Sequence, residues 1–236
     1  MSAEASLQQF AETQSSEEFA LQNSRLLKVA LRGHEVQAKL GTMVAYQGDV
    51  KFEHAGSGGM ARLVKRVATG EDAKFMKCSG TGELFLAEGA QEIHVLKLDS
   101  DQITCNGRNL LAFDAGIDWD IKKVEGAGGV LGGGLFNVSL KGTGNVALLS
   151  DGPPVLLDVG DAPTFADPNA AITWSSGVTT RLKSDINVKT LIGKGSGETW
   201  QIGFEGTGWV LVQPSEGRVS GLGSGSGGGI FNALGG

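Results

Sequence analysis

The chain contains 236 residues, of which 40% are hydrophobic and 38 are glycine, and its formal net charge is −6. This apolar content can form a buried core, which excludes the intrinsically disordered class with its low hydrophobicity and high net charge. Phosphate backbones are bound by basic protein faces, so the acidic balance argues against nucleic acid as a partner.

The cysteine count and the N-terminal composition bear on the compartment. Cys78 and Cys105 are too few for a disulfide framework, and we expect two buried thiols in a reducing environment. The first 24 residues hold no Lys or Arg, which argues against a secretory signal and a mitochondrial presequence. No apolar run reaches the roughly 18 residues of a transmembrane helix. The expected location is the cytoplasm, with peripheral membrane contact as a further option.

The first element in chain order is a polar N-terminal segment, residues 1–25. Ser15 and Glu18 have the spacing of a capping box ahead of Phe19, which predicts a short helix in this segment.

Two sequence elements then recur three times. A Gly-Thr-Gly tripeptide that opens an apolar run begins at Gly80, Gly142 and Gly206, at intervals of 62 and 64 residues. Ahead of each tripeptide lie two short apolar runs separated by a turn, such as Asn106-Gly107, and turns of this kind connect β-strands. The paired runs are 36–38 with 43–46, 103–105 with 110–113, and 164–166 with 171–174.

The repeat predicts the fold class. Tyr46, Phe113 and Trp174 occupy one equivalent position, and the consecutive apolar residues after each tripeptide are typical of a strand covered on both faces. We expect an all-β protein of three tandem β repeats in a pseudo-threefold arrangement, each a short double-stranded β-helix or jelly-roll-like unit. The predicted units are 26–88, 89–150 and 151–213, followed by a Gly/Ser-rich tail, 214–236.

The sequence holds no recognisable catalytic motif, and we expect a protein that is not an enzyme and binds no cofactor. The nucleophile elbow and the phosphate-binding loop are absent. His34, His54 and His94 lie 20 and 40 residues apart, unlike paired metal ligands, and are interpreted as turn and strand-edge residues. The remaining candidates are interpreted as exposed acids and core aromatics, namely Asp99, Asp101, Asp118, Asp120, Trp119, Trp174, Trp200 and Trp209.

A segment that mixes glycine with large apolar residues precedes each tripeptide. If these segments share one face, they form an apolar surface of the kind that contacts proteins or membranes; packing against the neighbouring repeat is the alternative. Lys65 and Arg66 add a short basic patch. The predicted interaction residues, including the apolar end of the tail, are Leu63, Val64, Lys65, Arg66, Val130, Leu131, Leu135, Phe136, Leu191, Ile192, Ile230 and Phe231.

The runs 26–38 and 41–46 resemble the opening signature of the family named for the "altered inheritance of mitochondria" protein 24. The stretches 128–149 and 206–213 resemble its later blocks, so the resemblance covers about residues 19–213. It implies three tandem units similar to the trp RNA-binding attenuation protein, no known enzymatic activity and no catalytic residues. The mitochondrial member is associated with inner-membrane organisation. Because we expect no import presequence in this chain, we do not assign that role to it.

These observations favour a non-enzymatic β-scaffold that acts through its surface, in protein assembly or self-association and at a membrane face. The alternative is a small-molecule or metal-binding module that uses the junction between repeats. A hydrolase with a non-standard site is a third option.

Overall fold

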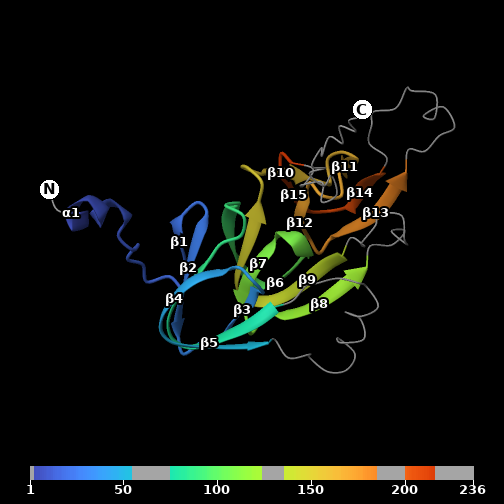
Figure 1. The fold of residues 1–236 in the computed structure, drawn as a ribbon. Coiled ribbons are helices and arrows are strands. Elements are labelled where there is room, and N and C mark those ends of the chain that lie inside the picture. The colour runs from blue at the N-terminus through green and yellow to red at the C-terminus, as the bar shows by residue number, and fades with distance from the viewer. Residues whose placement is uncertain (1–2, 55–74, 124–135, 185–199, 216–236) are drawn as a thin grey trace, which may run out of the picture.

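The structure is a computed structural model that describes residues 3–54, 75–123, 136–184 and 200–215 (Figure 1). Helical structure is confined to α1 (Ala3–Leu7) and the single turns η1 (Gln8–Phe10) and η2 (Gly107–Asn109) within these ranges. All strand pairs are antiparallel, so the all-β prediction is confirmed. The strands are β1 (Phe19–Asn23), β2 (Leu26–Arg32), β3 (Val36–Lys39), β4 (Met43–His54), β5 (Phe75–Leu86), β6 (Glu92–Asn106), β7 (Leu110–Asp114), β8 (Asp118–Lys123), β9 (Phe136–Ser150), β10 (Val155–Asp158), β11 (Thr164–Ala166), β12 (Ala171–Ser175), β13 (Val178–Ser184), β14 (Trp200–Gly206) and β15 (Trp209–Val212).

The strands form one large sheet and one small sheet. The large sheet follows the order β1-β2-β5-β3-β7-β9-β6-β12-β15-β10, with β4 on β5 and β8 on β9. The small sheet has the order β11-β14-β13. In Figure 1, β1 to β5 lie on the left and β11 to β14 on the upper right, with β6 to β9 between them.

The first two Gly-Thr-Gly tripeptides lie within β5 and β9, and the third begins at Gly206, the last residue of β14. The predicted equivalent aromatics pair with the apolar residue two places after each tripeptide: Tyr46 with Leu84, Phe113 with Val146, and Trp174 with Val210. Each of these pairings shows a register shift just before the aromatic residue, which marks a β-bulge.

Backbone pairing joins the stretches predicted as successive units. β3 pairs with β7, where Ala38 lies opposite Ala112, and β6 pairs with β12, where Cys105 lies opposite Thr173. In both junctions the first short run of one unit meets the second short run of the next unit. We call these the first and second junctions.

Glycine is required where the tripeptide strands bend. Gly80 has a φ of +114°, and a Cβ atom there would overlap the carbonyl oxygen of Asp49 on the paired strand. Gly144 has a φ of +150°, and its Cβ would lie 2.8 Å from Asp114 Oδ2. These glycines therefore serve both backbone conformation and close approach.

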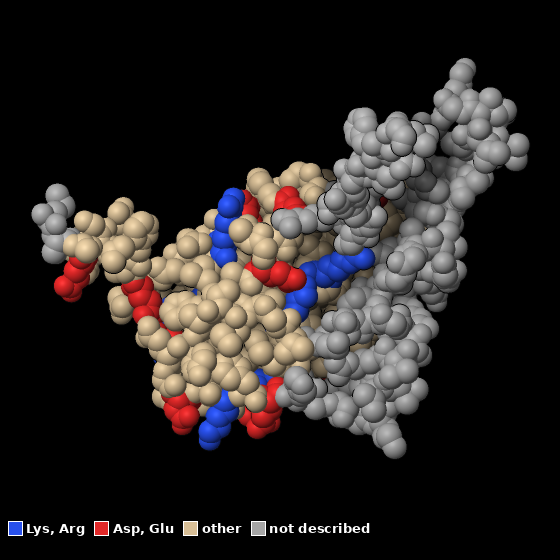
Figure 2. Space-filling view, in the orientation of Figure 1, with Lys and Arg blue, Asp and Glu red and all other residues tan. Residues whose placement is uncertain are grey.

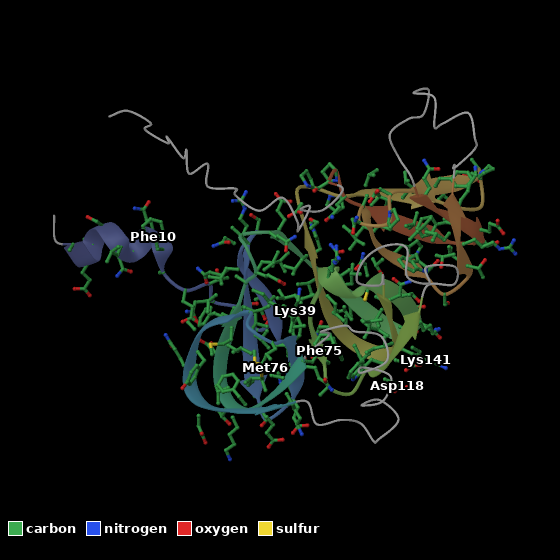
Figure 3. All side chains as sticks on the ribbon, turned by 45° about the vertical axis from the view of Figure 1, so that its right-hand side comes forward. Phe10, Lys39, Phe75, Met76, Asp118 and Lys141 are labelled. Carbon is green, nitrogen blue, oxygen red and sulfur yellow. The ribbon has the colours of Figure 1, made fainter. Side chains whose placement is uncertain are left out.

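The core of the described residues consists of three clusters, and the first two combine residues of more than one predicted unit. Phe75 and Met76, adjacent at the start of β5 (Figure 3), belong to the second and first clusters respectively, so β5 contributes to both. The first cluster is Phe19, Leu27, Val29, Leu31, Val36, Ala38, Met76, Cys78, Leu84, Leu86, Ile93, Leu111, Ala112, Ala147 and Leu149. The second is Phe75, Leu98, Ile103, Cys105, Leu110, Phe113, Ile117, Trp119, Ile121, Val138, Leu140, Val146, Leu148 and Ile172, and the third is Val159, Ala171, Trp174, Val178, Ile202, Phe204 and Val210.

The N-terminal segment contains a short helix, as predicted, but the helix does not lie at the capping-box spacing of Ser15 and Glu18. The helix lies earlier, at α1, and Phe19 begins β1, which pairs with β2. The buried side chain of Phe19 in the first cluster explains the difference, because packing of a strand outweighs a local capping pattern.

A buried ammonium group fixes the N-terminal segment to the sheet. Lys28 Nζ forms ion pairs with Glu12 and with Glu83 (2.9 Å), and donates to the Thr13 carbonyl at 3.0 Å. Burial alone would lower the pKa of Lys28, but hydrogen bonds to the two carboxylates outweigh it and the pKa is raised. The charge is therefore retained and compensated inside the protein.

No helix among the described residues is both long and apolar enough to cross a membrane.

Replacing Gly80 with Ala should lower the free energy of unfolding by roughly 1–3 kcal/mol or more, the cost of a strained backbone plus steric overlap. Urea denaturation measures the effect. Gly41→Ala is the matched control, because Gly41 has a φ of +87° but nothing within 4 Å of a Cβ. Equal losses in the two variants would show that close approach at Gly80 contributes nothing.

Candidate functional site

A pocket at the first junction brings together acidic groups and an imidazole from three chain segments. It has a volume of about 390 Å³ and is lined by Glu18, His34, Glu35, Asp114, Ala115 and Gly116. Ligand atoms of Glu18, His34 and Asp114 lie within 4.8 Å of one another. Among the described residues, these three side chains form the group that is close enough together to hold a metal ion.

Backbone pairing positions each of the three side chains. Glu18 immediately precedes β1, and its carbonyl accepts a hydrogen bond from Ala30 N–H at 2.8 Å. His34 follows Gly33, whose φ of +87° turns the chain between β2 and β3. Asp114 is the last residue of β7 and lies opposite Val36 on β3. The β3–β7 pairing therefore places Asp114 beside the β2–β3 turn that contains His34.

The hydrogen bonds of the pocket are incomplete. Asp114 Oδ2 accepts from the backbone N–H of Asn145 at 2.7 Å and from its side-chain amide at 3.1 Å. His34 Nδ1 lies 3.8 Å from Glu18 Oε1. Within the described part of the chain, His34 Nε2 and Asp114 Oδ1 are buried without a hydrogen-bond partner. Unsatisfied buried polar atoms are uncommon, and a bound ion or water is one reason for them.

The electrostatics of the pocket centre on Asp114. Burial raises the pKa of its carboxyl, and the nearby Glu18 carboxylate acts in the same direction. The Asn145 hydrogen bonds and His34 lower the pKa but do not cancel the rise. A cation in the pocket would relieve both unfavourable contributions.

The donor set suits a first-row divalent cation. Two carboxylates and one imidazole are ligands that Zn²⁺ and related ions accept. Metal–ligand bonds of about 2.0–2.2 Å place atoms that share an ion roughly 3–3.5 Å apart. The present spacing is wider, so side-chain rotation would be needed to close the site.

The three histidines singled out in the sequence lie on different elements, and the singled-out acids form no metal-binding group with them among the described residues. His94 Nε2 contacts Ser150 Oγ at 2.7 Å, and burial lowers its pKa. His54 ends β4, outside the residues whose side chains are described. Asp99, Asp101 and Asp118 are exposed, as expected for surface acids, whereas Asp120 is half-buried.

Of the four tryptophans expected in the core, two are buried, Trp209 is half-buried against the second cluster, and the side chain of Trp200 lies outside the described residues. Trp119 and Trp174 lie in the second and third clusters, which confirms their core assignment. Cys78 and Cys105 are free buried thiols, and burial raises their pKa to about 11 and about 12.

The predicted apolar interaction surface falls almost wholly outside the described residues. Only Phe136 is placed, at the start of β9 opposite Lys123. The others lie in 55–74, 124–135, 185–199 and 216–236, so this surface stays a prediction.

Sequence reasoning missed the grouping of Glu18, His34 and Asp114. His34 and Asp114 are 80 residues apart. The one available signal was the alignment of the repeats. If run 110–113 pairs with run 36–38 in antiparallel fashion, the residue after the former lies near the residues before the latter.

Comparisons with known proteins bear on the family and the fold. Residues 19–215 match the family described as AIM24, mitochondrial biogenesis AIM24. The crystal structure of a Streptococcus pyogenes protein is similar at a TM-score of 0.67 and 21% identity, over 84% of this chain and 92% of that one. At this identity the likeness supports the fold alone. No curated protein matches the chain.

The raised pKa of Asp114 predicts a pH dependence of stability. The folded state holds the Asp114 proton more tightly than the unfolded chain, so stability is lost as the pH rises from 3.8 through the raised pKa. Asp114→Asn removes this titration, and the stability of the variant relative to the wild type should increase over that window. Unfolding free energies from urea denaturation at a series of pH values measure the difference.

Asp99→Asn is the control, because Asp99 is exposed. A difference between Asp114→Asn and the wild type that stays flat with pH would contradict the prediction.

Proposed function

The chain belongs to the AIM24 family, and from this premise we propose that it is a non-enzymatic β-scaffold that acts in protein assembly, including at a membrane face. The observation that carries the proposal is a set of exposed apolar side chains on described strands. They are Val44, Tyr46 and Phe52 on β4, Val155 and Leu156 on β10, and Phe165 on β11.

Exposed apolar residues on strands favour contact with another protein. An edge strand leaves backbone N–H and C=O groups free to pair with a second chain, and apolar side chains there add burial. β10 lies at one end of the large sheet and β11 at one edge of the small sheet. The family description names a biological process rather than a reaction, which is consistent with a role through contacts.

The charge distribution also supports protein rather than nucleic acid as partner. Figure 2 shows Lys and Arg side chains scattered among Asp and Glu on this face, with no broad basic area in its described part. A nucleic-acid backbone would require such an area.

We also infer that the three units are tandem copies of one β unit, similar to the trp RNA-binding attenuation protein. The matched registers of Tyr46, Phe113 and Trp174 support this inference. So do the two junctions, which pair the same elements in the same register.

The scaffold proposal is tested by comparing proteins recovered from native lysate with three baits. One bait is the wild-type chain, one carries Gly/Ser replacements of 56–68, 126–134 and 221–236, and one carries Leu156→Asp, at a leucine that is 63% exposed. We expect specific partners of the wild type to be lost from at least one altered bait. Thermal unfolding serves as the folding control. Identical recovery by all three folded baits would contradict the proposal.

A second candidate function is divalent-cation binding at the first junction. The buried, unpartnered His34 Nε2 and Asp114 Oδ1 favour it, because both residues line a pocket that contains further oxygen ligands. Such an ion would join β7 to the β2–β3 turn and so fix two units together.

Titration calorimetry of chelator-treated protein with Zn²⁺ or Mn²⁺ tests this candidate. We expect binding of one ion and a stabilisation of about 2.7 kcal/mol at a free concentration of 100 Kd. His34→Ala and Asp114→Asn should abolish both effects, whereas His94→Ala should keep them. Acid should weaken binding, since the ligands must be deprotonated. Binding that survives both pocket variants would place the ion elsewhere.

A further inference from the structure

Three equivalent strand segments differ sharply in exposure. β7 and β12 are buried in the two junctions, whereas the equivalent start of β4 is not. At the aromatic position Phe113 is 0% exposed and Trp174 3%, but Tyr46 is 49% exposed. At the bulge position Leu111 and Ile172 are both 0% exposed, but Val44 is 58% exposed.

The bulge residue normally packs into the preceding unit. Leu111, from the second unit, belongs to the first core cluster, and Ile172, from the third unit, belongs to the second cluster. Val44 is the equivalent residue of the first unit, and no preceding unit packs against it among the described residues. Its exposure therefore follows from its place at the beginning of the series.

The other end of the series lacks the complementary strand. β3 pairs with β5 and β7, and the second half of β6 pairs with β9 and β12. The equivalent strand β11 pairs only with β14 within the described residues, and its Phe165 is 46% exposed. We call residues 43–47 the head edge and β11 the tail edge.

We propose that the tail edge of one chain pairs with the head edge of a second copy of this chain, forming a third junction like the two within the chain. The proposal rests on the scaffold function above and names its partner. Carrying over the register of the two junctions places Thr164 opposite Gln47, Phe165 opposite Tyr46, and Ala166 opposite Ala45. It also delivers Val44 to the third core cluster, as Leu111 reaches the first.

The contact is short and directional. Pro163 and Pro168 flank the tail edge, and proline cannot extend a strand pairing, so the added pairing is confined to about three residues. The head and tail edges lie on opposite sides of the molecule in Figure 1, so one chain cannot join its own edges. Copies therefore add head to tail, which gives a closed ring or a filament.

Cross-linking tests the register. Ala45→Cys and Ala166→Cys are made in separate chains and mixed under mild oxidation, because directly opposite residues of antiparallel strands lie within disulfide reach. The native cysteines are 0% exposed and do not compete. We expect a covalent species of twice the 24.4 kDa chain mass in the mixture, and far less from Ala45→Cys mixed with Thr164→Cys, which is two residues out of register. Equal yields from the two mixtures would overturn the register.

Sedimentation velocity over a range of concentrations tests the association itself. The wild type should form species larger than one chain as concentration rises, and Val44→Asp should remain a single chain without loss of thermal stability. Val155→Asp is the matched control, a valine that is 53% exposed on β10 and outside the proposed junction. A wild type that stays a single chain throughout, or an assembly that Val155→Asp disrupts and Val44→Asp does not, would overturn the proposal.

Failure of this inference is distinguishable from failure of the scaffold function. A single-chain protein that still recovers partners lost from the altered baits would leave the scaffold function standing and exclude self-association. A chain that assembles with itself but recovers no other protein would support the third junction and restrict the scaffold function to the chain's own copies.

Discussion

The antiparallel pairing between one unit's first short strand and the next unit's second short strand is the interaction on which the structure depends. In the first junction, pairing of β3 with β7 places Leu111 in the first core cluster while Phe113 remains in the second. The same strand thus closes two cores. Neither core would be complete alone, which is the usual situation in repeat proteins, where a unit buries its apolar face against a neighbour.

The candidate metal-binding pocket is a consequence of that pairing. Its histidine and its buried carboxylate come from different units and meet only because β7 ends beside the turn before β3. The second junction has Ser175 where the first has Asp114, and Ser175 Oγ accepts from Trp209 N–H at 3.1 Å much as Asp114 accepts from Asn145. The position therefore has a shared structural role in holding the strand after the second and third tripeptides. Asp114 differs because it adds a charge next to His34 and Glu18.

The exposed ends of the unit series and the pocket connect the fold to its proposed roles. An open series of such junctions leaves one second short strand unpaired at its beginning and one first short strand unpaired at its end. Unpaired edge strands are either shielded from other chains or pair with them. Here the unpaired strands carry the exposed apolar residues Val44, Tyr46 and Phe165 rather than charged residues, which favours pairing with another chain. An ion in the pocket would bind side chains of the first and second units and so strengthen the first junction. The proposed contact between chains has the same strand pairing as this junction.

The sequence by itself determined the all-β class and the burial of both cysteines, because these follow from local apolar patterns and turn residues. It misplaced the N-terminal helix, since Phe19 is drawn into a strand by a core formed from residues far along the chain. The meeting of His34 with Asp114 and the unequal exposure of Val44, Leu111 and Ile172 were decided only by the tertiary structure. Equivalent positions in a repeat have the same local sequence signal, but their burial depends on whether a neighbouring unit is present, and that is a property of the assembled chain.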